Sequence, residues 1–341
     1  MDQYSLPLTP AALRKLRHTL LAWYNAHRRE LPWRRDADPY RVWVSEIMLQ
    51  QTRVAAVVEH YARFMQRFPD VQSLAAAREA SVLAVWSGLG YYHRARRMHQ
   101  AAKLIARARK GIFPRAAEEW RELPGIGRYT AAAIASIAFG EAMAVVDGNV
   151  ERVLNRVFGA AGGREAAWQR AESLLDRTRP GDFNQAMMEL GATVCTPRAP
   201  QCAMCPFYKW CVTRGTGNAR PQSIRKRRQL TYGLARQNGA VLLVQRPADA
   251  SLMAGMWELP AFSAAQQNGD EPVARLRHAI TDTDYEVSVF AVPPRKVHSL
   301  EVNARWCAPR QWERLPLTGL ARKILCRFPD ESRVNPSESK P

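Results

Sequence analysis

The sequence lacks the features of a membrane or secreted protein. No apolar run approaches the roughly 18 residues that a membrane span needs, and the best candidate, Ala131–Phe139, has nine. The first ten residues, MDQYSLPLTP, have neither the basic nor the apolar region of a signal peptide. A hydrophobic content of 47% with 24% charged residues excludes disorder for most of the chain. We therefore expect a folded cytoplasmic protein with no membrane partner.

Lysine is also scarce. Only 8 of the 50 Lys and Arg residues are lysine, and with 31 acidic residues the formal net charge is +19. Residues 1–228 carry 36 basic and 19 acidic residues (net +17), whereas residues 229–341 carry 14 and 12 (net +2). This asymmetry predicts a polyanionic partner for the first part of the chain. The preference for arginine fits bidentate phosphate recognition, but a GC-rich genome gives the same bias, so both explanations remain open.

Four of the six cysteines are clustered. They fall within 17 residues in the pattern C-x6-C-x2-C-x5-C, at Cys195, Cys202, Cys205 and Cys211. A reduced cluster of this density predicts a tetrahedral four-thiolate metal site or an iron–sulfur cluster rather than disulfides, and the spacing does not separate iron–sulfur from zinc. Cys307 and Cys326 stand alone, and we expect both to be small buried side chains.

Helical patterns dominate residues 9–219. Thr9-Pro10 and Asp38-Pro39 are helix-start signals, and the second precedes an expected helix over 40–68. Its apolar stripe consists of Trp43, Ile47, Val54, Val58 and Tyr61. Further helices are predicted over 71–86, 93–109, 116–122, 128–139, 149–157, 164–178 and 182–194.

The pattern changes after a basic stretch at 220–228, which is typical of a linker. Strand-like runs at 232–236 and 240–246 flank Asn238-Gly239, a strong hairpin signal. Other strands are predicted at 286–292, 296–302 and 304–307, with one helix near 318–328, so residues 229–330 have an α+β pattern. We expect residues 331–341 to be disordered.

Several motifs combine turn residues with chemistry-bearing side chains. Leu123-Pro-Gly-Ile-Gly-Arg-Tyr-Thr130 has a tight turn whose backbone N–H groups can approach a phosphate, although a plain turn between helices would look similar. Asp147 precedes a helix and is by default an N-cap. Glu46, at the edge of an apolar stripe, could be desolvated enough to act as a proton donor, although most helical Glu residues are solvated. The segment 88–97 mixes glycine, two tyrosines and three arginines, as in base wedging, although Tyr91 and Tyr92 could simply belong to the core.

Taken together and in order, these motifs resemble the helix-hairpin-helix DNA glycosylases with a cysteine-loop iron–sulfur cluster, and most closely the adenine DNA glycosylases of the MutY type. The resemblance is dense over 10–215 and looser over 229–330. The motifs that carry it, besides the four cysteines, are Leu31-Pro-Trp33, Ser45–Thr52, Gly88–Tyr92, Leu123–Thr130, Val146–Val150 and Phe183–Gly191.

The resemblance implies a fold and a reaction. The fold is a mainly α catalytic region of two helical lobes over 1–219, a linker at 220–228 and a smaller α+β Nudix-like domain over 229–330. The reaction is excision of adenine mispaired with 8-oxoguanine or guanine in double-stranded DNA, after the nucleotide is flipped out of the duplex. The implied cofactor is one [4Fe–4S] cluster on the four cysteines. The protein would act as a bacterial cytoplasmic monomer, at the nucleoid when bound to DNA.

The resemblance also implies roles for individual residues. Glu46 would protonate adenine, Asp147 would stabilise the sugar cation, and Asn149 and Tyr129 would assist. The adenine pocket would include Trp33, Gln185 and Glu189. Contacts to DNA would come from Gln50, Gln51, Tyr91, Gly125, Gly127 and Arg128.

One departure concerns the C-terminal domain. Its Leu252–Pro260 stretch resembles a Nudix motif, but the Glu-rich metal-binding helix of active Nudix hydrolases is missing, so we predict no pyrophosphohydrolase activity. The family's Phe-Ser-His loop for 8-oxoguanine is replaced by Val297-His298-Ser299, which makes His298 and Ser299 the candidates for recognition of the opposing base.

The main competing hypothesis is a bifunctional pyrimidine-lesion glycosylase and lyase of the endonuclease III type. Such enzymes have a Schiff-base lysine where this sequence has Tyr129. Two further hypotheses are a non-catalytic DNA-binding or redox-sensing protein and an unrelated zinc protein. The presence of both Glu46 and Asp147 disfavours a protein without catalysis.

Overall fold

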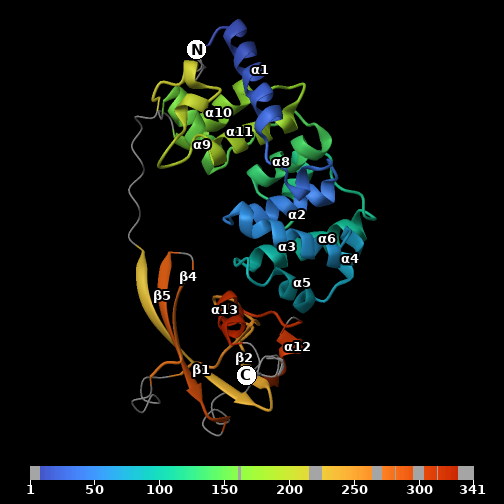
Figure 1. The fold of residues 1–341 in the computed structure, drawn as a ribbon. Helices are drawn as coiled ribbons and strands as arrows, with labels where there is room; N and C mark the ends of the chain where they lie inside the picture. The colour runs from blue at the N-terminus through green and yellow to red at the C-terminus, as the bar shows by residue number, and fades with distance from the viewer. Residues whose placement is uncertain are drawn as a thin grey trace, which may run out of the picture. The chain divides into compact units, whose positions relative to one another are not determined.

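The computed structural model describes residues 8–159, 163–214, 225–262, 271–280, 282–294, 303–312 and 314–328. The chain divides into two compact units: residues 1–76 with 97–221, and residues 77–96 with 222–341. The first unit is helical and the second is built around a sheet (Figure 1). The predicted fold class, a mainly α region followed by a smaller α+β domain, is thereby confirmed.

Helices account for the regular structure of the first 214 residues. They are α1 (Pro10–His27), η1 (Pro32–Arg34), α2 (Pro39–Leu49), α3 (Val54–Arg67), α4 (Val71–Ala76), α5 (Glu79–Trp86), α6 (His93–Ala108), α7 (Ala117–Arg121), α8 (Arg128–Phe139), α9 (Gly148–Phe158), α10 (Gly163–Leu174), α11 (Pro180–Thr193), η2 (Cys202–Met204) and η3 (Tyr208–Trp210). Both start signals are confirmed: the Thr9 side chain accepts from Ala12 N and the Asp38 side chain from Arg41 N.

The expected single helix over 40–68 is wrong. It is interrupted between α2 and α3, where Gln51 has a left-handed φ of 55°, a conformation that no α-helix continues through. The interruption also changes which residues of α3 face the core. Val57 is therefore buried, whereas Val58, assigned to the apolar stripe, is 36% exposed. The expected helix over 71–86 is likewise divided into α4 and α5.

Helix α11 packs against α1, α8 and α9 and thereby organises the core of the first unit. Two glycines allow this close packing. A Cβ at Gly181 would lie 2.7 Å from the Ser136 carbonyl oxygen of α8, and one at Gly191 would lie 2.7 Å from Asn149 Cβ of α9. The side chains around this helix form an apolar core that includes Leu16, Leu20, Leu154, Leu174, Phe183 and Leu190.

The second unit contains a sheet with the order β3-β2-β1-β5-β4, with β6 paired to β2. Its strands are β1 (Lys226–Gln237), β2 (Ala240–Gln245), β3 (Trp257–Glu258), β4 (Ala274–Ile280), β5 (Thr283–Val292) and β6 (Ala304–Cys307), and its C-terminal helices are α12 (Pro309–Trp312) and α13 (Gly319–Arg327). β1 runs parallel to β5, and the pairs β1–β2 and β4–β5 are antiparallel. The predicted hairpin is confirmed, with φ of 48° at Asn238 and 73° at Gly239 as a type I′ turn requires.

Some expectations for this region differ from the structure. β1 begins at Lys226, inside the stretch expected to be linker, and β3 and β4 were not anticipated. Residues 295–302, which include the whole strand expected over 296–302, lie outside the described residues, as does the tail 331–341. Cys307 is buried as predicted, but Cys326 is exposed, so the expectation of a buried thiol there is wrong.

The segment 77–96 belongs to the second unit although the sequence assigns it to the helical region. Ser87 Oγ donates to the Leu317 carbonyl oxygen at 2.6 Å, and Arg322 Nε donates to Ser87 Oγ at 3.0 Å.

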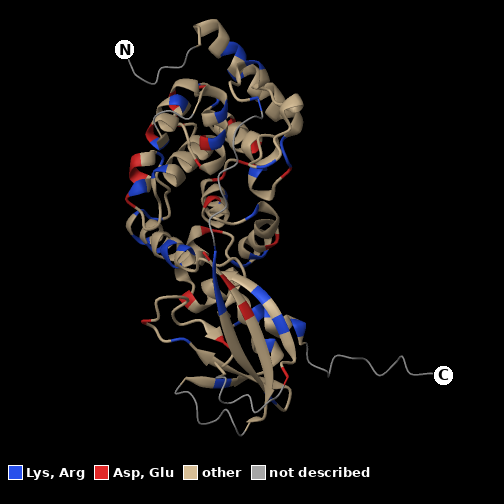
Figure 2. Cartoon of the chain, turned by 90° about the vertical axis from the view of Figure 1, so that its left-hand side faces the viewer, with Lys and Arg blue, Asp and Glu red and all other residues tan. Residues whose placement is uncertain are grey.

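Lys and Arg positions occur on the helices and along β1 and β4 (Figure 2). No helix among the described residues has the length and apolarity needed to cross a membrane.

Candidate active site

Helix α2 places Glu46 in the protein interior. The side chains from Tyr40 to Met48 are nearly all buried, and Glu46 is only 6% exposed. A buried carboxyl group requires a hydrogen-bond partner, and Tyr129 of α8 supplies it: the Tyr129 hydroxyl donates to Glu46 Oε2 at 3.0 Å. Residues 83 positions apart in the sequence thus meet, as the proposed catalytic set requires.

The environment of Glu46 favours its neutral form. Burial raises the pKa of Glu46 to about 7, while the hydrogen bond from Tyr129 opposes this effect. The negative charge of Asp147 raises the pKa further, and the positive charge of Arg34 lowers it. A carboxyl group with this pKa holds a proton near neutral pH and can donate it.

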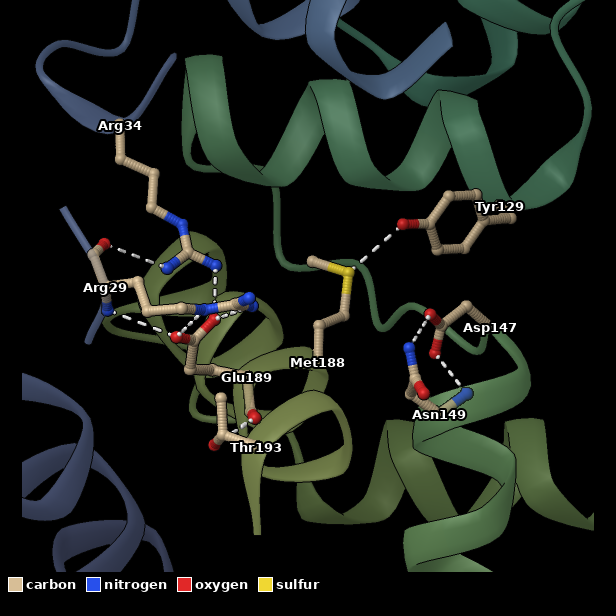
Figure 3. A network of polar contacts seen from close by, with 8 residues as sticks. All are labelled: Arg29, Arg34, Tyr129, Asp147, Asn149, Met188, Glu189 and Thr193. Carbon is tan, nitrogen blue, oxygen red and sulfur yellow. Dashed lines mark hydrogen bonds and ion pairs between the residues drawn. The ribbon is translucent and has the colours of Figure 1, made fainter. Parts of the chain in front are cut away.

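Asp147 is the N-cap of α9, as its sequence position indicates. Its Oδ1 accepts from the backbone N–H groups of Asn149 (2.9 Å) and Val150 (2.7 Å), and its Oδ2 accepts from Asn149 Nδ2 at 3.1 Å (Figure 3). These donors hold the Asp147 carboxyl group in a fixed orientation at the N-terminus of α9. The site therefore holds two carboxyl groups in different environments: Glu46 is desolvated, and Asp147 accepts three N–H bonds.

Arg152 connects this acid to the cysteine region. Its Nη2 donates to Asn149 Oδ1 at 2.8 Å and to the Gly191 carbonyl oxygen at 2.8 Å, and its Nε donates to the Cys195 carbonyl oxygen at 2.9 Å. The sequence offered no signal for this residue beyond its basic character.

Glu189 of α11 is fully enclosed and paired with two arginines. Arg29 Nε lies 2.7 Å from Glu189 Oε1, and Arg34 Nη2 lies 2.9 Å from Oε2 (Figure 3). Burial alone would raise the pKa of Glu189, but the hydrogen bond from Arg29 and the charge of Arg34 outweigh it and hold that pKa below its usual value. Neither arginine was identified from the sequence.

The other expected pocket residues lie in the same unit. Trp33 of η1 is buried, with its ring edge-on to Tyr61 at a centroid distance of 5.3 Å. Gln185 lies on α11 one turn before Glu189 and is partly buried. Met188, on the same helix, was missed by sequence reasoning, and its sulfur lies 3.1 Å from the Tyr129 hydroxyl (Figure 3).

The expected DNA-contacting residues lie at turns. Gly125 has φ of 81° and Gly127 caps α8, so the segment 123–127 forms the tight turn that the sequence indicates. Gln50 Nε2 donates to Thr130 Oγ1 at 3.0 Å, and Gln51 is exposed beside it. Arg128 pairs with Glu165 and lies over the Trp168 ring.

In the second unit, Tyr91 has φ of 47°, and the Arg94 guanidinium lies 5.3 Å from its ring centroid. His298 and Ser299 lie outside the described residues.

The four clustered cysteines line one small cavity, together with Val153, Arg156, Val157, Val194, Pro200 and Thr213. Arg156 Nη1 donates to Cys195 Sγ and the Arg214 backbone N–H donates to Cys211 Sγ, each at 3.4 Å. Four thiol groups around one cavity, with N–H donors directed at two of them, fit a four-thiolate group. Among the described residues, however, no three or more His, Cys, Asp or Glu side chains are arranged to hold a metal ion.

Comparison with known proteins is consistent with this geometry. Residues 44–177 match the HhH-GPD superfamily of base excision DNA repair proteins, and residues 231–327 match the NUDIX domain. A solved thermostable thymine-DNA glycosylase is 30% identical, with a TM-score of 0.56 over 60% of this chain and 97% of its own. An endonuclease III–DNA complex, at 22% identity and a TM-score of 0.52, shares the fold.

The fold and the paired acids thus define a helix-hairpin-helix protein of the base-excision class. The mouse adenine DNA glycosylase is 35% identical over all of this chain and 83% of its own length, and the human one is 48% identical over 63% of this chain and 42% of its own length. The chain belongs to the adenine DNA glycosylase family. The predicted resemblance and the Nudix-like C-terminal domain are therefore confirmed.

Proposed function

We propose that this protein is a monofunctional DNA glycosylase that hydrolyses the N-glycosidic bond of adenine mispaired with 8-oxoguanine or guanine in base excision repair. The observation that carries the proposal is the pair of carboxyl groups, one buried with a pKa near neutrality and one accepting three N–H bonds. Cleavage of a glycosidic bond through an oxocarbenium-like state needs one acid and one carboxylate.

Glu46 is the acid in this reaction. It protonates the departing adenine, which leaves as a neutral base, and then assists the attacking water. Its burial and the negative charge of Asp147 keep the proton available near neutral pH.

Asp147 stabilises the positive charge that develops on the sugar. Asn149 holds the Asp147 carboxylate through its side-chain amide at 3.1 Å. Because Asp147 is anchored at a helix N-terminus, its carboxylate is oriented before the substrate binds.

Tyr129 favours simple hydrolysis over strand cleavage. A glycosylase with lyase activity needs an amine that forms a Schiff base with the sugar, and a phenol cannot do so. Tyr129 instead donates to Glu46. The endonuclease III-type alternative is therefore not favoured.

The adenine pocket uses Trp33, Gln185 and Glu189. Both carboxylate oxygens of Glu189 are bonded to arginines, so Arg29 and Arg34 hold this residue in a fixed position and join the proposed pocket. Trp33 supplies an apolar wall for the flipped base.

Duplex DNA that contains the mispair is the proposed partner. The backbone N–H groups around Gly125 and Gly127 hold a phosphate with help from Arg128, and Gln50, Gln51 and Tyr91 occupy the gap left by the flipped nucleotide. His298 and Ser299 remain candidates for recognition of the opposing base. A monomer acting in the bacterial cytoplasm, at the nucleoid when bound to DNA, stays a prediction.

One [4Fe–4S] cluster on Cys195, Cys202, Cys205 and Cys211 is the proposed cofactor. When bound, it would supply a rigid crosslink for the loop 195–211 and a redox-active group. The expected signature is a brown protein with about four irons per chain. A colourless preparation with one zinc ion would overturn the assignment.

A single-turnover assay tests the function. Duplexes with adenine opposite 8-oxoguanine, guanine or cytosine are incubated with excess protein, and release of adenine is measured with the wild type and Glu46→Gln. We expect release from the first two duplexes and none with the variant. Failure to release adenine from any duplex overturns the proposal, and a borohydride-trapped protein–DNA adduct would revive the lyase alternative.

A further inference from the structure

The Tyr129 hydroxyl has two acceptors within hydrogen-bond distance. Glu46 Oε2 lies 3.0 Å away and Met188 Sδ lies 3.1 Å away. Figure 3 shows the Met188 sulfur directed at this hydroxyl. A phenol has one hydrogen, so it can donate to only one of these acceptors at a time.

The protonation state of Glu46 decides between them. When Glu46 is ionised, it can only accept, and the Tyr129 hydrogen goes to the carboxylate. When Glu46 is protonated, its own O–H can donate to the Tyr129 oxygen. The Tyr129 hydrogen then needs another acceptor, and the Met188 thioether is in place to receive it.

We propose that Met188 is a positioning residue that keeps Glu46 in its proton-donating form by accepting the hydrogen of Tyr129. The inference rests on the proposed role of Glu46 as the acid. The relay runs from the Glu46 O–H to the Tyr129 oxygen, and from the Tyr129 O–H to Met188 sulfur. No hydrogen in this arrangement lacks an acceptor.

The other charged groups that act on Glu46 belong to different elements. Asp147 at the start of α9 favours the protonated form, and Arg34 of η1 favours the ionised form. Both act through their charge and do not depend on sulfur. A change at Met188 therefore alters the relay and leaves these two effects in place.

Packing is the competing explanation for Met188. The side chain packs beside the cluster of Ala132, Ala133 and Val145, so it also fills space. Leucine fills a similar volume and is usually tolerated in place of methionine, but it has no acceptor. Met188→Leu therefore separates the two roles. Met187→Leu is the matched control, because Met187 is the neighbouring residue on α11 and packs in the core.

The test is the pH profile of single-turnover adenine release. In Met188→Leu the protonated form of Glu46 loses support. We therefore expect the alkaline limb to move to lower pH by about half a unit, with the rate at low pH nearly unchanged. Met187→Leu should keep the wild-type midpoint. Met188→Gln, which restores an acceptor, should return the midpoint toward that of the wild type. Equal midpoints for Met188→Leu and Met187→Leu overturn the proposal.

The same substitution in a Tyr129→Phe variant tests whether Met188 acts through the Tyr129 hydroxyl. In Tyr129→Phe there is no hydroxyl for the sulfur to accept from, so adding Met188→Leu should cause no further shift. A shift of the same size in both backgrounds means that Met188 acts by packing and overturns the relay. If Glu46→Gln retains full activity, it is the proposed function of Glu46 that fails, and the two failures are thus distinguishable.

Discussion

Glu46 makes the stability of the protein depend on pH. Its pKa of about 7 lies above the ordinary value of 4.5, so the folded state binds more protons than the unfolded state between these pH values. Stability contributed by this group is therefore present at low pH and lost as pH rises through 7. We expect Glu46→Gln to raise the free energy of unfolding by up to about 3 kcal/mol at alkaline pH and by less than about 1 kcal/mol near pH 5.

Chemical denaturation of the wild type and Glu46→Gln at the two pH values measures this difference. Glu118→Gln is the control, because Glu118 is exposed on α7 and its replacement should change stability little at either pH. An equal effect of Glu46→Gln at both pH values would contradict the assigned environment.

The charge of Asp147 can be separated from its capping role. Asparagine keeps an acceptor for the N–H groups of Asn149 and Val150 but removes the negative charge. We expect Asp147→Asn to lower stability by no more than about 1 kcal/mol and to slow adenine release by at least about 100-fold. Asp38→Asn, at the exposed N-cap of α2, should have a similar effect on stability and none on base release. Similar rates for the two variants would assign Asp147 a capping role alone.

The sequence predicted Glu46, Asp147 and Tyr129 because each lies in a short motif. Their partners could not be predicted in this way. Arg29 and Arg34 lie 160 and 155 residues from Glu189 in the chain, and only the packing of α11 brings them together. Met188 was missed for a related reason, since a methionine in a helix looks like core until its neighbour is known.

At the scale of elements, the boundaries set by capping residues were predictable, and the interruption after α2 was not. The apolar side chains on either side of Gln51 continue a helical spacing closely enough to suggest one helix. The left-handed turn at Gln51 places this exposed residue between α2 and α3, which bears on its proposed contact with DNA. Strand β4 was missed because three of its seven side chains are polar (Arg275, Arg277 and His278), and both arginines are exposed.

Because α11 packs closely against α9, a methyl group added at Gly191 should destabilise the protein. At Gly191 a Cβ would lie 2.7 Å from Asn149 Cβ and 3.0 Å from its carbonyl oxygen, so the helices must separate. We expect Gly191→Ala to lower the free energy of unfolding by about 1–3 kcal/mol. Gly148→Ala is the control, since a Cβ there meets nothing within 4 Å. Thermal unfolding of the two variants measures the difference, and equal stabilities would argue against tight packing at this crossing.

For the whole molecule, the change in composition along the sequence predicted two parts. It did not predict that residues 77–96 belong to the second unit. Ser87 and Leu317 are 230 residues apart, and no local pattern connects them. The cysteine spacing left iron–sulfur and zinc unresolved, and the choice between them came from the resemblance.

Charge at this scale predicts how affinity depends on salt. Residues 1–228 have a net charge of +17, against +2 for the remainder, and Figure 2 marks the Lys and Arg positions among the described residues. Each phosphate contact contributes about −0.9 to the slope of log affinity against log salt. With three or more such contacts, we expect a slope of about −3 or steeper, measured with Glu46→Gln to prevent turnover.

The wild-type rate of adenine release at saturating protein should change little over the same salt range, because the chemical step occurs in a buried site that salt screens weakly. A matched duplex without the mispair should show a similar slope at lower affinity, since phosphate contacts do not read sequence. A slope near zero for both duplexes would mean that the excess of arginine reflects genome composition and not recognition of the DNA backbone.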